Sequence, residues 1–434
     1  MSGAVKFPQT SVPVAGEYDL IVCGGGLSGC AAAWNAAERG SNVLLIEHYH
    51  KLGGVPVSGL LGIISGLRLD AEITVDGLFL REMLRRLEAV NGSQVRDSGW
   101  AYRVDPEKLD LVLFQMLQEA GVKILLQTTL ISAQKEQQKI SYIVTASKQG
   151  LEAWRARFFI DDTGDADLAY LTGCPVRYGR DSDGKVQSSS LTFKLAGIDM
   201  AAAPLKMTEA TALWRKQPHK TPTNHTVITY LPGTNGEAAV NMTHILDCAP
   251  LTHEGQMRIR KEGMEQAQEI AEFFRENLPG FRNCYVAQTA MQPGIRETRR
   301  IVGAYTLTEE DVIDGRDFDD EIARCGWGID IHVPDKIHGE TPMPHFCLKK
   351  SYGIPFRCIV PQGVENLLIA GRPISATHEA FASSRINGTC IAIGEICGIA
   401  AVLAKGIWET QKIDVKSLQA EAMAQHGIVH RKMI

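Results

Sequence analysis

The chain has 434 residues, of which 44% are hydrophobic, 22% charged and 7% aromatic, a composition typical of a globular protein with two or three domains. Its formal net charge is -5 and it contains no long block of Lys or Arg, so neither nucleic acid nor an anionic membrane surface is favoured as a partner. These features favour a protein that acts on a small molecule.

Targeting segments and metal motifs are not evident. Residues 1–16 contain one Lys and no apolar stretch long enough for a signal peptide, and the apolar run 396–404 is far shorter than the roughly 20 residues that cross a bilayer. The ten cysteines include no C-x-x-C pair and have no His at metal-ligand spacing. We therefore expect a cytoplasmic protein without a membrane partner or a metal site, in which most cysteines are small buried side chains.

The first elements form a strand, a turn, a helix and a second strand. Residues 18–23 (YDLIVC) are apolar and β-branched, which predicts a buried parallel strand. The alanine-rich residues 27–39 predict a helix that ends at Gly40. Residues 43–47 (VLLIE) then predict a second strand, so the whole unit takes about thirty residues.

The turn of this unit matches G-x-G-x-x-G at Gly24, Gly26 and Gly29. This spacing permits a tight turn, close approach of the backbone to a pyrophosphate, and a helix packed against its strand. The helix N-terminus, with Leu27 and Ser28 in its first turn, supplies unpaired N–H groups and partial positive charge to phosphate oxygens. The unit therefore predicts a site for the ADP half of a dinucleotide.

Glu47 ends the second strand, where its carboxylate can accept both ribose hydroxyls of an adenosine. The chain continues with the glycine-rich segment 48–66, in which Gly53 and Gly54 follow six residues after the acid. This arrangement resembles the FAD-dependent oxidoreductases of the glutathione-reductase-like superfamily. Within it, the chain is similar to a bacterial FAD-dependent oxidoreductase family related to the fumarate reductase flavoproteins. An NAD-dependent dehydrogenase is the disfavoured alternative.

The resemblance covers nearly the whole chain. It is carried by the separate segments 104–109, 117–129, 159–167, 294–303, 366–372 and 378–395. It implies FAD as the cofactor and, together with the glycine turn, the following cofactor-binding residues: Gly24, Gly26, Leu27, Ser28, Gly29, Glu47, His48, Gly53, Gly54, Ser58, Thr129, Leu130, Thr163, Gly164, Asp165, Gly371, Arg372, Arg385, Asn387 and Gly388.

Two features of this set differ from better-known relatives. Arg372 stands where many relatives carry Asp or Glu, which leaves open how the ribityl chain and phosphates are held. His48 and His50 precede the glycine pair, as does the histidine that binds FAD covalently in fumarate reductase relatives, but the surrounding residues do not match. We therefore expect noncovalent FAD. The predicted helix 389–405, preceded by Asn387 and Gly388, would stabilise negative charge on a reduced flavin.

The composition changes over about residues 181–290. Alternating residues in 187–197 and 238–246 predict antiparallel strands, and 263–277 predicts a helix. The sequence thus predicts an α/β fold: a Rossmann-like FAD-binding domain with a parallel sheet in three layers, and an inserted α+β substrate or cap domain. The expected bounds are 17–180 and 353–410 for the FAD-binding domain, 181–352 for the substrate or cap domain, and 411–434 for a C-terminal helical tail.

Five residues are candidates for catalysis: Arg296, His332, Tyr352, Arg357 and His378. If its segment is helical, Arg296 shares a face with Arg299 and can clamp a carboxylate; the alternative is a structural ion-pair network that includes Glu297 and Arg300. His332 can transfer a proton near neutral pH, or be structural. Tyr352 and Arg357 can orient a substrate, and His378 flanks the segment expected to cover the flavin.

The predicted function is hydride transfer between flavin N5 and a small polar metabolite, either anionic or polyhydroxylated. No second G-x-G-x-x-G follows a strand, so electrons should come from the substrate itself or involve an external acceptor or donor. A flavin-binding redox sensor or scaffold subunit without turnover is the alternative.

Overall fold

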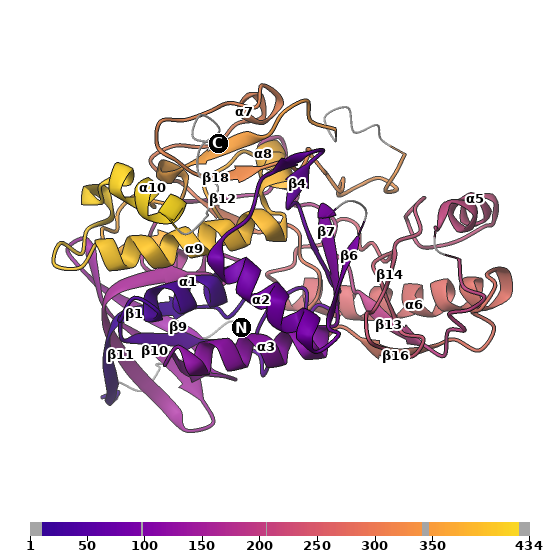
Figure 1. Cartoon of the computed structure of the whole chain (residues 1–434), viewed down its shortest axis with the longest axis horizontal. Helices are drawn as coiled ribbons and strands as arrows, with labels where there is room; N and C mark the ends of the chain where they lie inside the picture. Colours follow the sequence, from indigo (N-terminus) through magenta and orange to yellow (C-terminus); the bar gives the residue numbers. More distant parts are fainter. Residues whose placement is uncertain (1–10, 97–98, 205, 341–346, 425–434) are drawn as a thin grey trace, which may run out of the picture.

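The computed structural model describes residues 11–96, 99–204, 206–340 and 347–424. Two hydrophobic cores organise this part of the chain. Figure 1 shows the larger core around a central sheet at the left and a smaller lobe with α5 and α6 at the right.

The central sheet has seven strands in the order β8-β2-β1-β11-β10-β9, with β20 also paired to β11. These strands are β1 (Val14–Cys23), β2 (Val43–Ile46), β8 (Lys123–Leu125), β9 (Thr129–Glu136), β10 (Lys139–Ser147), β11 (Gly150–Asp161) and β20 (Leu367–Ile369). β8, β2, β1, β11 and β20 are parallel, whereas β9 and β10 form an antiparallel edge. The predicted α/β architecture with a Rossmann-like parallel sheet is confirmed.

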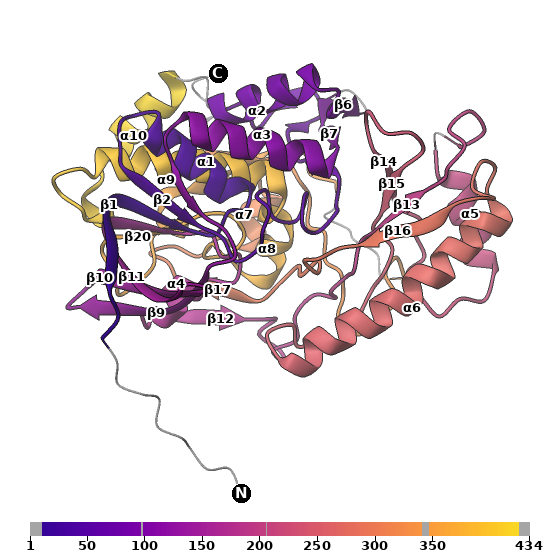
Figure 2. The ribbon, with the colours of Figure 1, turned by 90° about the horizontal axis from the view of Figure 1, so that it is seen from below.

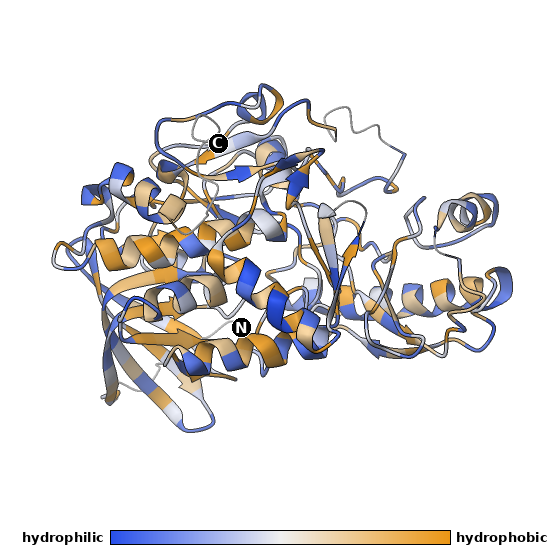
Figure 3. Ribbon diagram, viewed as in Figure 1, coloured by the Kyte–Doolittle hydropathy of each residue, from blue (hydrophilic) through white to orange (hydrophobic). Residues whose placement is uncertain are grey.

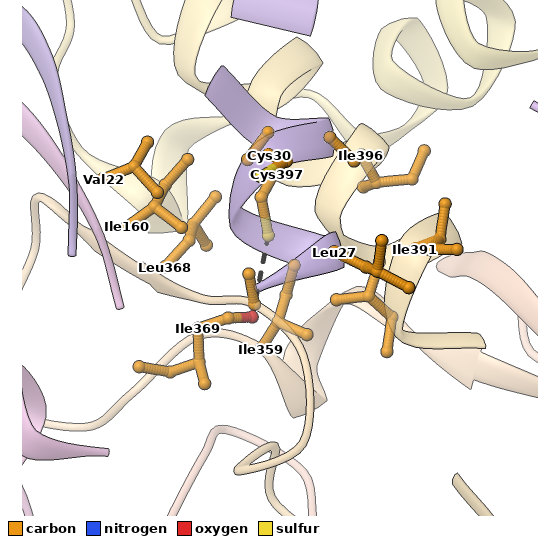
Figure 4. Packing of buried hydrophobic residues seen from close by; sticks show 14 of the residues in the cluster. Val22, Leu27, Cys30, Ile160, Ile359, Leu368, Ile369, Ile391, Ile396 and Cys397 are labelled. Carbon is orange, nitrogen blue, oxygen red and sulfur yellow. Dashed lines mark hydrogen bonds between the residues drawn. The ribbon is translucent and has the colours of Figure 1, made fainter. Parts of the chain in front are cut away.

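Helices α1 (Leu27–Ala37), α3 (Pro106–Glu119) and α9 (Asn387–Leu403) lie along one side of this sheet (Figure 2). α9 is hydrophobic along most of its length (Figure 3) and is almost wholly buried. Its glycines permit close contact with α1, because a Cβ on Gly394 would lie 2.2 Å from the carbonyl oxygen of Ser28. Figure 4 shows Leu27 of α1 among isoleucines of α9 and β20, and Cys397 donating to the carbonyl of Ile369 at 3.6 Å.

The smaller core lies between α6 (His253–Asn277) and a sheet in the order β14-β15-β13-β16. These strands are β13 (Phe193–Ala196), β14 (Ile228–Tyr230), β15 (Ala238–Val240) and β16 (Tyr285–Thr289), and α5 (Thr208–Lys216) lies nearby. The predicted antiparallel pairing is confirmed, since β13 pairs with β15. The long helix begins ten residues earlier than predicted, because Thr252 accepts the N–H of Gly255 and caps it there.

The remaining elements connect the two cores. Small sheets contain β3 (Ile63–Ser65), β7 (Ala101–Val104) and β6 (Ser93–Arg96); β4 (Arg68–Leu69) and β5 (Glu72–Ile73); β12 (Val176–Tyr178) and β17 (Arg299–Ile301); and β18 (Glu321–Cys325) and β19 (Tyr352–Pro355). The other helices are α2 (Leu78–Ala89), α4 (Asp167–Leu171), α7 (Glu309–Ile313), α8 (His378–Ser384) and α10 (Val415–Ala424), with short 3-10 turns at Phe356–Cys358 and Thr410–Lys412.

The domain bounds stay a prediction. Ile301, Ile322 and Ile329 pack in the larger core, although they fall within the range 181–352 expected for the substrate or cap domain. Of the expected C-terminal helical tail, α10 is helical, and residues 425–434 lie outside the described residues.

Nine of the ten cysteines are buried and Cys347 is exposed, which confirms the expectation for most of them. Within the described ranges, no single helix is long and apolar enough to cross a membrane. Only α8 and α9 taken together pass that test, and they meet at a bend of 86°.

Glu395 of α9 is buried and faces the N-terminus of α2, which no side chain of its own caps. Its carboxylate oxygens lie 3.4 Å from the N–H groups of Phe79 and Leu80. Burial raises the pKa of Glu395 from 4.5 to about 7, although these amides and Arg39 oppose the shift. The folded protein therefore favours the protonated carboxyl, and the stability this gives is lost as pH rises from about 4.5 to 7.

We predict that Glu395→Gln has little effect on the free energy of unfolding at pH 5 and raises it by as much as about 3 kcal/mol at pH 8. The amide keeps an acceptor for α2 without a charge that must be buried. Urea denaturation at both pH values measures this difference. Glu88→Gln, at the exposed C-terminal end of α2, is the control and should follow the wild-type profile. A Glu395→Gln protein less stable than wild type at pH 8 contradicts the assignment.

Candidate cofactor and substrate site

The glycine turn between β1 and α1 is tightly packed at Gly24 and Gly29, where a side chain would meet backbone atoms. Gly24 has a φ of +108°, and a Cβ there would lie 2.1 Å from the carbonyl oxygen of Asp162. A Cβ on Gly29 would lie 2.1 Å from the carbonyl oxygen of Gly24, so α1 packs directly on the turn. The N-cap residue of α1, Gly26, has no side chain to cap the helix, which leaves the first-turn amides of Leu27 and Ser28 available to phosphate oxygens.

The acid and the glycine pair meet this turn. The carboxylate of Glu47 accepts the N–H of Gly25 at 2.6 Å. Gly53 donates its N–H to the carbonyl of Gly25 at 2.8 Å and forms a parallel bridge with Gly26. A Cβ on Gly54 would lie 3.2 Å from the Cα of Gly26. The structure therefore brings together the three sequence features on which the cofactor prediction depends.

Asp162 is a buried acid that the sequence analysis did not single out. Its Oδ2 accepts the N–H of Gly29 at 2.7 Å. Its Oδ1 packs against Gly371, because a Cβ on that glycine would lie 2.5 Å from this oxygen. Burial raises the pKa of Asp162 well above its usual range; the Gly29 amide opposes this, and the charges of Asp161 and Glu47 add to it. The two adjacent acids in residues 159–165 (FIDDTGD) were the available signal in the sequence, whereas the resemblance to the family pointed to Thr163, Gly164 and Asp165.

Arg372 links three segments around the T-G-D turn. Its guanidinium donates to the carbonyl of Gly164 at 2.9 Å, to the carbonyl of Ile295, and to the carboxylate of Asp165. The basic residue at this position is thus neutralised by a neighbouring acid. Thr163 lies in the same turn and donates its amide and hydroxyl to the carboxylate of Asp161. These contacts make Arg372 and Thr163 supports of the turn.

Three of the expected cofactor-binding residues lie together beyond Glu47: His48, Thr129 and Leu130. Nδ1 of His48 is 2.9 Å from the hydroxyl of Thr129, and Leu130 follows in β9. The backbone joins the two segments, because the N–H of Thr128 donates to the carbonyl of Glu47 at 3.0 Å.

The N-terminus of α9 is fixed against β3. The side chain of Asn387 donates to the carbonyl of Ile63 at 2.8 Å and accepts the N–H of Ser65 at 2.7 Å. A Cβ on Gly388 would lie 2.6 Å from the carbonyl oxygen of Ser65. The helix begins at Asn387, two residues before the predicted start.

Several buried polar atoms, some on these segments and others at residues 187–189 and 292, have no hydrogen-bond partner within the described part of the chain. They are Oγ of Ser58, Ser188, Ser189 and Ser384, Oγ1 of Thr389, Nε2 of Gln187, Oε1 of Gln292 and Nε of Arg385. A buried polar group without a partner costs about 1–3 kcal/mol, so these atoms favour a polar ligand that would satisfy them. Together with the glycine turn and the acid, these groups fit FAD.

A buried charged cluster lies where the segment 294–298 meets the loop after β18. Arg296 donates to the carbonyl of Ser188 at 2.7 Å, and burial together with the charge of Arg385 lowers the pKa of Arg296 to about 9. Oδ1 of Asp330 lies 3.4 Å from Nε2 of His332, and its Oδ2 lies 3.5 Å from the guanidinium of Arg385. Although burial opposes it, His332 and Arg385 hold the pKa of Asp330 well below its usual range. Burial and Arg296 lower the pKa of His332 to about 3.

His378 lies in a second buried network. Its Nδ1 is 2.9 Å from Oε2 of Glu297, which also accepts the N–H of Gln187 at 3.0 Å. The other oxygen of Glu297 binds the guanidinium of Arg300. Arg299 pairs with Asp167 at 2.7 Å. Arg299 and Arg300 thus form the structural ion pairs that the sequence analysis left as an alternative.

The conditional helix face of Arg296 and Arg299 is wrong, and the surroundings of Arg357 and Tyr352 give no support to a catalytic role. Residues 294–298 are not helical and Arg299–Ile301 is strand β17, so Arg296 and Arg299 do not share a helix face. Arg357 is half-exposed and binds Asp320 at 2.8 Å, which makes it part of a surface ion pair. Tyr352 is fully buried, with its hydroxyl 2.6 Å from Oγ of Ser383. The catalytic roles of these residues stay predictions.

Two histidines that the sequence analysis did not select lie beside His332. Nε2 of His244 is 3.0 Å from Nδ1 of His332, and His338 completes the group. Burial and Arg296 lower the pKa of His244 well below its usual range and that of His338 to about 4. His338 lies six positions after His332 in the loop between β18 and β19, whereas His244 comes from the loop after β15 and had no signal in the sequence that related it to them.

A model of the family described as "FAD dependent oxidoreductase" matches residues 19–422. The chain is 30% identical over 150 residues to digeranylgeranylglycerophospholipid reductase 2 of Methanopyrus kandleri, which covers 34% of this chain and 38% of that protein. It is 43% identical over 75 residues to methylenetetrahydrofolate–tRNA-(uracil-5-)-methyltransferase of a Geobacter species, 16% of this chain and 17% of that one. The chain therefore spans well under half the length of these curated relatives.

Among solved structures, p-nitrophenol 4-monooxygenase of Pseudomonas putida is similar, with a TM-score of 0.50 and 13% identity over 94% of this chain and 84% of that one. At this identity the likeness supports the fold alone.

Proposed function

Because this chain belongs to the FAD dependent oxidoreductase family, we propose that it binds FAD noncovalently and transfers a hydride between flavin N5 and a small polar metabolite, anionic or polyhydroxylated. The flavin supplies the two-electron chemistry, and the protein must fix the substrate, move a proton and exclude water. We also place the chain among the glutathione-reductase-like flavoproteins related to fumarate reductase, with residues 181–352 as the substrate or cap domain.

The observation that carries the substrate proposal is the buried cluster of Arg296, Asp330 and Arg385. One carboxylate faces two guanidinium groups, so the cluster holds an excess positive charge away from water. A carboxylate or other oxyanion of the substrate would neutralise that charge and accept directed hydrogen bonds from the guanidinium groups. The anionic class is therefore favoured over the polyhydroxylated one.

His332 contacts this cluster, and His378 is held by Glu297, the residue next to Arg296 in the chain. His332 touches Asp330 directly and is neutral at pH 7. Burial and the charge of Arg296 lower its pKa to about 3, so it becomes a useful base only when a bound anion offsets the charge of Arg296. His378 is oriented by Glu297, whose carboxylate also accepts the amide of Gln187. We assign proton transfer to His332 and a positioning role to His378.

Noncovalent attachment is supported by the position of His48. Its Nδ1 is already close to the hydroxyl of Thr129, and it follows the acid expected to bind the ribose. A histidine here lies at the adenosine end of the expected cofactor. The cytoplasmic location and an external electron acceptor or donor stay predictions.

We predict that the purified protein shows flavin absorption near neutral pH and that acid precipitation releases the yellow colour into the supernatant. Anaerobic incubation with small hydroxy acids, dicarboxylates and sugar acids should then bleach the flavin with at least one anionic compound. Colour retained in the pellet contradicts noncovalent binding. Reduction by dithionite and reoxidation by carriers, without bleaching by any metabolite, favours the sensor or scaffold alternative.

A further inference from the structure

His244 comes from the loop after β15, whereas His332 and His338 lie six positions apart in the loop between β18 and β19. The backbone of each is fixed by a hydrogen bond. The N–H of His244 donates to the side-chain amide of Gln266 on α6 at 2.8 Å. The carbonyl of His332 accepts the N–H of Ser188 at 3.0 Å. The N–H of His338 donates to the carbonyl of Pro222 at 3.0 Å. One ring nitrogen from each histidine lies within 4.8 Å of the other two, so the group is assembled by the fold.

The contacts of two of these rings favour one tautomer of each. Nδ1 of His244 lies 3.1 Å from the carbonyl of Met242, which can only accept, so this nitrogen carries the proton. Nε2 of His332 lies 3.4 Å from the carboxylate of Asp330, which attracts the proton of that ring. The remaining nitrogens, Nε2 of His244 and Nδ1 of His332, then face each other with lone pairs at 3.0 Å.

Two facing lone pairs need a positive centre between or beside them. A shared proton can bridge only two nitrogens, whereas a metal ion can accept a lone pair from each of the three. Zinc binds histidine nitrogen at about 2.0–2.1 Å, which places two ligand nitrogens about 3.4 Å apart. The three rings lie nearly parallel, with interplanar angles of 20°, 13° and 12°, so they would have to turn to direct one nitrogen each at a common ion. The carbonyl of Met242 and the carboxylate of Asp330 are the partners that metal-bound histidines commonly have on their other nitrogen.

We propose that His244, His332 and His338 form a binding site for a divalent transition-metal ion such as Zn²⁺. Three neutral imidazoles leave a fourth position open, as in zinc sites that bind water or a substrate. Arg296 lies near enough to repel a bare cation, so an anion is the expected fourth ligand. A metal bound here would occupy the lone pair of His332 that accepts a proton in the proposed function, so the two roles of this residue are alternatives; the metal site itself requires neither FAD nor turnover.

The test is to load the purified full-length protein with Zn²⁺, remove excess ion by gel filtration, and measure the metal-to-protein ratio by mass spectrometry. Competition with a chromogenic chelator gives the affinity. Wild type should retain one ion per chain, and His244→Ala and His338→Ala should each weaken binding at least tenfold. His253→Ala, on the exposed first turn of α6, is the control for adventitious surface binding and should match wild type.

Flavin absorbance and circular dichroism of each variant report whether it has folded. Loss of metal from folded His244→Ala and His338→Ala proteins supports the site. A wild-type protein that retains no zinc, or variants that bind it as tightly as wild type, overturns the proposal. If a variant fails to fold, His338→Gln keeps the size of the side chain and gives the same comparison. Metal stoichiometry is measured apart from flavin reduction, so failure of the metal site and failure of the proposed oxidoreductase activity are distinguishable.

Discussion

Replacing Gly24 with Ala should abolish flavin retention and lower the free energy of unfolding by about 3 kcal/mol or more. Two effects add at this position. A φ of +108° is strained for any residue with a Cβ, which costs about 1–2 kcal/mol. The new Cβ would also lie 2.1 Å from the carbonyl oxygen of Asp162, and because that atom is backbone, β1 and β11 would have to separate. Flavin absorbance after gel filtration and urea denaturation measure the two results.

Gly40→Ala is the matched control for backbone strain. Gly40 lies at the other end of α1 and also has a positive φ, of +78°, but a Cβ there would meet nothing within 4 Å. We expect a loss of about 1 kcal/mol and full retention of flavin. If Gly24→Ala behaves like Gly40→Ala, the turn does not approach a cofactor as closely as we infer.

The central fold was predictable because its signals are local. The strand, glycine turn, helix and acid from Tyr18 to Glu47 lie within thirty residues, and each element has a pattern of its own. The observed helix α1 ends at Ala37 and the second strand at Ile46, within two residues of the expected limits. The alternation that predicted antiparallel strands is also local, and β13 and β15 pair accordingly.

The candidate substrate site was only partly predictable, because its members are brought together by tertiary structure. Arg296 and His332 could be chosen from their residue types, but Asp330 and His244 became relevant only once the loops that carry them met. A spacing of three residues would place Arg296 and Arg299 on one face if their segment were helical, but Arg296 lies in a loop and Arg299 in strand β17, which pairs with β12. The sequence also does not show how deeply a side chain is buried: Arg357 is half-exposed and Tyr352 is fully buried.

Glu297→Gln should destabilise the protein by about 3–5 kcal/mol, because it removes one member of a buried ionic network. Glu297 is fully buried and Arg300 almost so. Arg300 would keep its hydrogen bonds to the carbonyls of Ala376 and Gly179, but its charge would remain in the interior without a counter-ion. His378 would lose the carboxylate that orients its ring, so flavin reduction by an anionic substrate should also slow. Urea denaturation and anaerobic reduction rates measure the two effects.

Glu82→Gln is the matched control, since Glu82 also lies three residues before an arginine and also binds a second basic side chain. Its bonds to Arg85 and Arg86 lie at the surface of α2, where such pairs contribute about 1 kcal/mol or less. A double variant, Glu297→Gln with Arg300→Met, should recover part of the lost stability, because it removes the uncompensated charge as well. Equal losses in Glu297→Gln and Glu82→Gln would mean that the buried network contributes no more than a surface pair. That result would contradict the role we give Glu297, which is to compensate the buried charge of Arg300 and to orient His378.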